Sequence, residues 1–182
     1  EDCYAGVRGI DIAEKLGEQL KEYPSVKAWT NAACLAVFSD KKVGVLHGNS
    51  YSLIKPRTII NATGAREKSL AFPGNTLPGV YGAGAFQTLV NRDLVRPAKR
   101  LFIAGGGNVG LIAAYHALQA GIHVVGLIEL QAECSGYRVH IDKIKRLGVP
   151  VYTRHAILRA DGANGLETVT IAGVDAKFTP LQ

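Results

Sequence analysis

The stretch RLFIAGGGNVGLIAAYHALQAGIHVVGLIE, from Arg100 to Glu129, decides the fold of this chain. Leu101 to Ala104 is continuously apolar, as expected of a strand covered on both faces, and glycines with the spacing GxGxxG follow it. After the glycines, an apolar helical stretch ends at Gly121, and a second apolar run ends at Glu129. This order of strand, glycine turn, helix and strand predicts a βαβ unit of a parallel sheet.

Each of the three spaced glycines has its own mechanical role. Gly105 lets the chain turn tightly out of the strand, Gly107 lets the backbone approach a pyrophosphate, and Gly110 lets the helix lie against the sheet. The backbone N–H groups that open the helix, together with the helix dipole, favour a phosphate without any basic side chain. The acid that ends the second strand is suited to accept hydrogen bonds from a ribose. We therefore predict a dinucleotide site made of Gly105, Gly106, Gly107, Asn108, Val109, Gly110 and Glu129.

The nature of the nucleotide depends on the charges near the second strand. A ligand-free βαβ crossover is the alternative, but it would not require all three glycines. Glu129 would repel the 2′-phosphate of NADP, which predicts NAD as the cofactor. Arg138 and Lys143 follow the acid and could offset this repulsion, so NADP is the less favoured choice.

Composition indicates a globular protein. The chain has 182 residues, 47% of them apolar, and a net charge of +6, enough for one ordinary domain or two small ones. The basic residues are scattered, which argues against a nucleic-acid surface. No apolar run approaches the roughly 18 residues of a membrane span, and no signal-peptide pattern opens the chain, so the sequence predicts a cytoplasmic protein. Because the chain begins with Glu1 and ends within an apparent β segment, we expect it to be part of a longer protein.

The metal-binding and nucleophilic residue types lack the spacing that their chemistry needs. The three cysteines contain no CxxC pair, and the five histidines have no ligand spacing. Neither a metal site nor a redox dithiol is predicted, and no side chain can be named as a catalytic acid, base or nucleophile. These residues are Cys3, Cys34, Cys134, His47, His116, His123, His140 and His155.

Residue periodicity predicts the other elements. Apolar residues at helical spacing predict a surface helix from Ile12 to Tyr23, ended by Pro24. A helix after residue 137 should turn Ile141, Ile144 and Leu147 inward and stop at Gly148. Short apolar runs between turn residues predict strands, of which the second to fourth form an antiparallel meander. The predicted strands are Val26–Thr30, Cys34–Phe38, Val43–His47, Ser50–Ile54, Thr58–Ala62, Val149–Thr153, Ala156–Ala160 and Val169–Ala172.

Four segments carry a family resemblance. They are IINATGAR from Ile59, FPGNTLPGV from Phe72, GAGAFQT from Gly82, and the glycine motif from Gly105. Together they resemble the two-dinucleotide flavoproteins of the pyridine-nucleotide-disulfide oxidoreductase family. The second and third segments are most similar to the branch that contains subunits of sarcosine oxidase, opine and proline dehydrogenases, and hydrogen cyanide synthase.

This resemblance implies an α/β fold with Rossmann-like parallel sheet layers, β-meander insertions and two related, partial nucleotide-binding domains. Residues 1–97 would be part of an FAD-binding domain that lacks its N-terminal GxGxxG. Residues 98–182 would be an NAD-binding domain that is incomplete at its C-terminal end. The family's FAD contacts correspond to Ala62, Thr63 and Gly64. Disulfide reduction is not expected, because the family's CxxC is absent from this sequence.

The resemblance further implies an oxidoreductase, a dehydrogenase that passes hydride between NAD(H) and FAD in the full-length protein. The substrate would be an amine, an amino acid or a similar small molecule, and a catalytic or iron-sulfur partner subunit or an oligomer is compatible with this function. The fragment alone is expected to be inactive. The alternative is a non-catalytic nucleotide-fold scaffold for a multi-subunit dehydrogenase. The intact glycines and Glu129 favour a working nucleotide site, because a scaffold does not need them.

Overall fold

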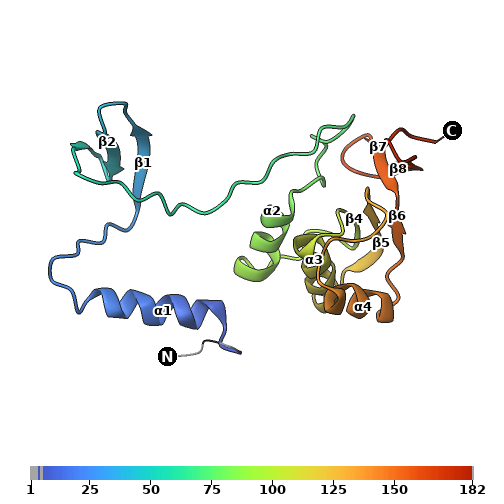
Figure 1. Cartoon of the computed structure of the whole chain (residues 1–182), viewed down its shortest axis with the longest axis horizontal. Helices are drawn as coiled ribbons and strands as arrows, with labels where there is room; N and C mark the ends of the chain where they lie inside the picture. The colour runs from blue at the N-terminus through green and yellow to red at the C-terminus, as the bar shows by residue number, and fades with distance from the viewer. Residues whose placement is uncertain (1–3, 5, 182) are drawn as a thin grey trace. The chain divides into compact units, whose positions relative to one another are not determined.

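The computed structural model describes Tyr4 and residues 6–181, which form two compact units (Figure 1). The first unit ends at Gly64 and the second begins at Ala65. Cys3 lies outside the described residues. The predicted functional boundary between residues 97 and 98 lies inside the second unit and stays a prediction.

Among its described residues, the first unit contains one helix and one small antiparallel sheet. The predicted surface helix is present but begins and ends earlier than expected, and the predicted meander is confirmed as a sheet with strand order β1-β2-β3. Its second turn contains Gly48 at φ +58°, a left-handed conformation that glycine adopts without strain. The elements are α1 (Gly9–Leu20), β1 (Ala32–Val37), β2 (Val43–His47) and β3 (Ser50–Ile54).

Two predicted strands of the first unit are wrong. Val26–Thr30 and Thr58–Ala62 are irregular, and within the described part of the chain neither segment pairs with a strand. Ile60, within the second of these segments, is 87% exposed. A strand forms only where its backbone groups find a neighbouring strand, so an apolar run alone cannot establish one.

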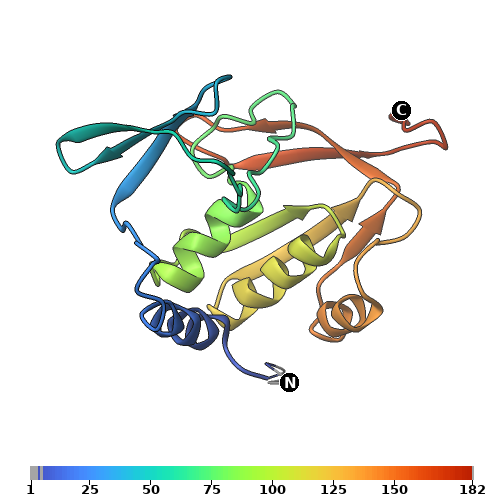
Figure 2. The same cartoon turned by 60° about the vertical axis from the view of Figure 1, so that its left-hand side comes forward.

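The second unit contains the predicted βαβ unit. Its parallel sheet has the order β4-β5-β6, from β4 (Arg100–Ala104), β5 (His123–Glu129) and β6 (Val151–Thr153). The helices α3 (Asn108–Gln119) and α4 (Arg138–Arg146) connect these strands, and α3 packs against β4 and β5 (Figure 2). The predicted α/β class with a Rossmann-like parallel sheet is confirmed.

Both connecting helices end in the same way, at the predicted glycines. Gly121 and Gly148 adopt left-handed φ values of +71° and +81°. After α3, Gly121 N–H donates to Leu118 O (3.1 Å) and Ile122 N–H donates to Ala117 O (2.9 Å). This pattern is the Schellman motif, and α4 ends with equivalent bonds. The glycines therefore stop the helices and direct the chain into β5 and β6.

The core of the second unit lies between its helices and the parallel sheet. The largest fully buried side chains are Leu111, Ile122, Leu127 and Ile144, and burying each one contributes roughly 1.5–3 kcal/mol. The prediction that Ile144 faces inward is confirmed. The same prediction for Leu147 is wrong, because α4 ends at Arg146 and the Leu147 side chain is 52% exposed.

A segment that we call the connector, Phe72–Val80, packs along the hairpin of β7 (His155–Asp161) and β8 (Thr168–Gly173). Ala160 N–H donates to Pro73 O (2.9 Å), and Leu166 N–H donates to Pro78 O (2.8 Å). Gly74 lies at φ +84°, and a Cβ there would overlap the carbonyl oxygen of Ala160. The glycine thus permits both the turn and the close approach of the two backbones.

Helical structure follows the connector. It consists of α2 (Ala83–Gln87) and a π-helical turn, η1 (Thr88–Arg92). Phe86 of α2 is buried in the core, and α2 packs against α3. Across residues 6–181, none of the helices has the length and apolar character required to cross a membrane.

We expect Gly110→Val to lower the stability of the second unit. A Cβ at this position would overlap the carbonyl oxygen of Gly105 and lie 3.5 Å from Ile103 Cγ2, so α3 must move away from the sheet. Overpacking of this kind costs about 1–3 kcal/mol. Urea unfolding followed by far-UV circular dichroism measures the loss. Gly107→Val is the matched control, because a Cβ there meets only Ser135 Oγ at 3.7 Å. Equal destabilisation by the two substitutions would contradict the assignment.

Candidate nucleotide-binding site

The glycine turn, Gly105–Gly110, joins β4 to the first turn of α3. Gly105 has φ +112°, a conformation that side chains rarely permit, and its N–H continues the sheet by donating to Ile128 O (2.8 Å). The space beside Gly107 is open except for Ser135 Oγ, as expected where a backbone must approach a ligand. Among the described residues, no side chain caps the first turn of α3. Its N–H groups are therefore available to an anion.

Glu129 is the buried polar residue beside this turn. Its side chain is 8% exposed, and Oε2 accepts a hydrogen bond from Gly106 N–H at 2.8 Å. Oε1 accepts from Gln131 N–H at 2.9 Å. Two backbone donors therefore fix the carboxylate at the end of β5. Since each oxygen has further acceptor capacity, the carboxylate can also accept from a ligand hydroxyl.

The structure brings the predicted residues of the glycine turn together with Glu129. The other predicted cofactor residues, Ala62, Thr63 and Gly64, belong to the first unit. There Thr63 donates from N–H (3.3 Å) and Oγ1 (2.9 Å) to Asn61 Oδ1, and the segment is exposed.

The loop between β5 and α4, residues 130–137, lies against the glycine turn, which sequence reasoning missed. Gly136 N–H donates to Gly106 O at 3.0 Å, and Tyr137 N–H donates to Asn108 Oδ1 at 2.7 Å. The Ser135-Gly136 dipeptide has the composition of a flexible turn, but the hydrogen bond from Gly136 N–H to Gly106 O holds its backbone in place. The glycine at position 136 is a local signal for this close contact, because a side chain there would overlap Leu111.

Cys134 forms part of the same loop, and its sulfur lies beside Gly106 and Glu129. Burial raises the pKa of the Cys134 thiol, and the negative charge of Glu129 raises it further, with Lys145 opposing. The thiol is therefore protonated near neutral pH and acts as a small half-buried side chain, not as a nucleophile.

The two basic residues that could offset the charge of Glu129 have other partners. Arg138 is the first residue of α4, and its side chain is 92% exposed and lies 3.7 Å from Asp142. Lys143 Nζ lies over the ring of Tyr115, 4.2 Å from its centroid. Lys143 thus makes a cation–π contact with α3. The sequence had suggested instead that Lys143 could offset the charge of Glu129.

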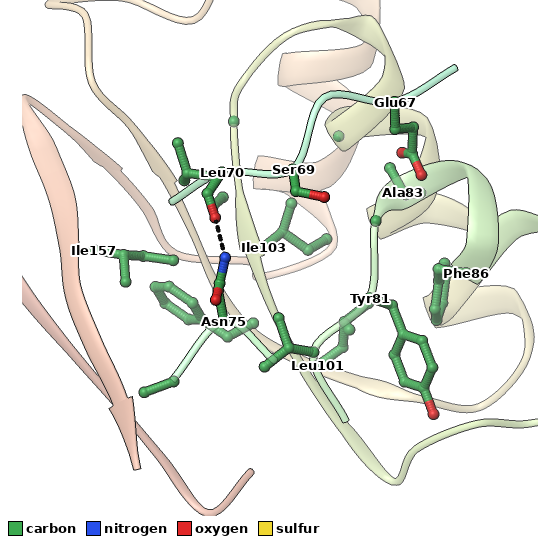
Figure 3. Close-up of a pocket in the computed structure, with 18 of the residues that line it drawn as sticks. Glu67, Ser69, Leu70, Asn75, Tyr81, Ala83, Phe86, Leu101, Ile103 and Ile157 are labelled. Atoms are coloured by element: carbon green, nitrogen blue, oxygen red, sulfur yellow. Dashed lines mark hydrogen bonds between the residues drawn. The ribbon is translucent and has the colours of Figure 1, made fainter. Parts of the chain in front are cut away.

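A cavity of about 780 Å³ adjoins the other side of the glycine turn and follows the edge of β4. Within residues 6–181, β4 pairs only with β5, so this edge is free. Figure 3 shows Leu101 and Ile103 of β4 facing the cavity, with Ile157 of β7 opposite. Mostly apolar side chains surround it, as in many ligand sites.

Two polar contacts order the rim of this cavity, and Figure 3 marks the one between Asn75 and Leu70. Asn75 Nδ2 donates to Leu70 O at 2.9 Å and fixes the connector. Glu67 Oε1 accepts a hydrogen bond from Gly84 N–H at 2.6 Å. This bond holds the segment that contains Glu67 against the start of α2.

Nothing among the described residues forms a metal site, and the described cysteines are free thiols. Two of the histidines have hydrogen-bond partners of another kind: His116 Nδ1 bonds Asn91 Nδ2 (3.1 Å), and His155 Nδ1 bonds Thr153 O (2.7 Å). The site thus offers backbone donors, one fixed carboxylate and an apolar cavity. This set is suited to binding and orienting a ligand.

Comparison with known proteins places these features in context. The chain is 29% identical over 138 residues to hydrogen cyanide synthase subunit HcnB of Pseudomonas aeruginosa, covering 67% of this chain and 30% of that protein. It is 30% identical over 154 residues to the benzene 1,2-dioxygenase system ferredoxin–NAD(+) reductase subunit of Pseudomonas putida, covering 81% of this chain and 37% of that protein. Subunits of sarcosine oxidase and opine oxidase also match, which confirms the predicted resemblance to this branch. The chain spans 30% to 42% of the length of the hydrogen cyanide synthase subunits that it matches.

Solved structures share the fold. The thioredoxin reductase of T. acidophilum matches with a TM-score of 0.67 at 18% sequence identity, covering 91% of this chain and 53% of that one. The sequence model of the family described as pyridine nucleotide-disulphide oxidoreductase matches residues 5–178. Since this match spans nearly the whole chain, the chain belongs to the pyridine nucleotide-disulphide oxidoreductase family.

Proposed function

We propose that the second unit binds NAD(H) and that the full-length protein is an oxidoreductase that passes hydride between NAD(H) and FAD. One observation carries the proposal: Glu129 is fixed by Gly106 N–H beside a helix start whose amides lack a side-chain cap among the described residues. A dinucleotide needs both features, an anion site for its pyrophosphate and an acceptor for its ribose.

The other half of the dinucleotide would extend to the cavity along β4. Dinucleotides cross the carboxyl end of the sheet, with their two halves on either side of the first strand. The cavity begins at Gly105 and Gly107, on the side of β4 away from Glu129, and its apolar walls suit an aromatic ring.

In this proposal the chain's own residues bind NAD(H) and orient it. Amides of the first turn of α3 hold the pyrophosphate, Glu129 accepts from the ribose, and the apolar cavity excludes water from the ring. NAD(H), with FAD in the full-length protein, supplies the hydride chemistry. Family membership supports this division, since this family uses FAD together with a pyridine nucleotide.

The substrate and partner of the full-length protein are proposed by analogy. The hydrogen cyanide synthase, sarcosine oxidase and opine oxidase relatives are subunits. By that analogy, we propose a small amine, amino acid or similar substrate and a partner subunit. The analogy does not extend to particular residues of this chain.

NAD is proposed over NADP because of the fixed charge of Glu129. Two like charges about 4 Å apart cost roughly 1 kcal/mol in water and about 4 kcal/mol at an effective dielectric constant of 20. Arg138 is exposed and near Asp142, and Lys143 lies on Tyr115, so neither offsets the repulsion without leaving its partner.

We expect Gly107→Val to abolish measurable NADH binding while leaving the fold intact. A branched side chain would fill the open space in which the backbone must approach the pyrophosphate. Enhancement of NADH fluorescence on titration measures binding, and circular dichroism checks the fold. A parent protein that fails to bind NADH would instead support the scaffold alternative. Parental affinity in the valine variant would refute the position of the pyrophosphate.

The parent should bind NADH at least tenfold more tightly than NADPH at low salt, and Glu129→Gln should reduce that ratio. Glutamine keeps an acceptor for Gly106 N–H but removes the charge that faces a 2′-phosphate. Dissociation constants for both nucleotides measure the ratio. Glu22→Gln is the matched control, since it makes the same change of charge at an exposed position in the first unit, outside the proposed site. Tighter NADPH binding by the parent would refute NAD, and an unchanged ratio in Glu129→Gln would show that another group selects the cofactor.

The chain as it stands should not retain FAD. Its segment matching the family's FAD contacts, Ala62 to Gly64, is exposed and irregular, so it offers no preformed surface for the flavin. After incubation with excess FAD and desalting, the protein should lack visible flavin absorbance. A stoichiometric yellow complex would contradict this expectation.

A further inference from the structure

Asn108 makes an unusual connection between two helices. It is the first residue of α3, yet its side-chain Oδ1 accepts a hydrogen bond (2.7 Å) from the N–H of Tyr137, the residue that precedes α4. A second bond, from Gly136 N–H to Gly106 O (3.0 Å), runs beside it. The 130–137 loop is therefore attached to the glycine turn at two adjacent points.

The packing under this loop leaves no room for a side chain at Gly136. A Cβ there would overlap Leu111 Cδ1 and would lie 3.0 Å from both Asn108 N and Asn108 Oδ1. Gly136 does not have a positive φ, so the glycine serves close approach. The loop backbone thus sits directly against the start of α3, and Asn108 is the side chain that holds it there.

This attachment determines where Ser135 lies. Its Oγ is 3.7 Å from the point that a Cβ of Gly107 would occupy, which is the open space next to the glycine turn. Among the described residues, the Ser135 hydroxyl has no hydrogen-bond partner. An exposed hydroxyl held beside an anion site is a ready donor to a phosphate oxygen.

We propose that Asn108 is a positioning residue that holds the 130–137 loop in place, so that the Ser135 hydroxyl donates a hydrogen bond to the pyrophosphate of bound NAD(H). This inference rests on the nucleotide site proposed above. Asn108 acts through the loop, and Ser135 is the contact. The loop then forms one wall of the nucleotide site, directly beside the start of α3.

The experiment compares Asn108→Ala, Ser135→Ala and the double variant by NADH fluorescence titration. Each single substitution should raise the dissociation constant about three- to tenfold, the factor for one net hydrogen bond. The double variant should lose no more than the weaker-binding single variant, because both substitutions remove the same contact. Ser135→Thr, which keeps the hydroxyl, should retain near-parental affinity.

A second measurement follows the loop itself. Without nucleotide, amide hydrogen exchange at Gly136 and Tyr137 should be faster in Asn108→Ala than in the parent and unchanged in Ser135→Ala. Asn91→Ala is the matched control, since the Asn91 side chain also joins two elements, through His116, but lies outside the proposed site. It should leave both the exchange and the dissociation constant unchanged.

Failure of the inference is distinguishable from failure of the proposed function. A parent that does not bind NADH overturns both. A parent that binds NADH, with faster exchange but an unchanged dissociation constant in Asn108→Ala, overturns the inference alone. Additive losses in the double variant overturn it as well, because Asn108 would then act independently of Ser135.

Discussion

The hydrogen bond from Gly106 N–H to the buried Glu129 carboxylate is the interaction on which the site depends. It joins the end of β4 to the end of β5, and it partners a charge that would otherwise be costly to bury. The bond requires Gly106 to lie close to the acid, since a Cβ there would be 3.0 Å from Oε2 and would crowd Cys134. Gly106 lies between the first two glycines of the GxGxxG motif, at a position that the motif leaves open. It is a glycine because a side chain there would crowd Glu129 and Cys134.

The sequence predicted those parts of the fold that depend on neighbouring residues. Gly121 and Gly148 mark helix ends because the Schellman bonds involve residues within one turn. The antiparallel sheet of the first unit follows from short turns between adjacent strands. The sequence also predicted that Glu129 lies beside the glycine turn, because one helix separates this acid from the turn.

The errors arose where distant residues decide the structure. Thr58–Ala62 has the composition of a strand but finds no partner within the described chain. The Ser135-Gly136 pair resembles a flexible turn, and only its contacts with Gly106 and Asn108 make it ordered. The connector was identified as a mark of the family, but its physical reason, the backbone contact of Gly74 with Ala160, is not readable from spacing.

The connector's bonds to the β7–β8 hairpin also impose an order on folding during synthesis. Pro73 and Pro78 leave the ribosome before the βαβ unit, whereas their partners Ala160 and Leu166 emerge after it. Until the hairpin has been made, the connector lacks the two backbone partners that hold it in the folded second unit. Such long-range contacts slow folding and lengthen the exposure of apolar surface. The interval during which the connector is undocked therefore ends only when Leu166, in the turn after β7, has emerged.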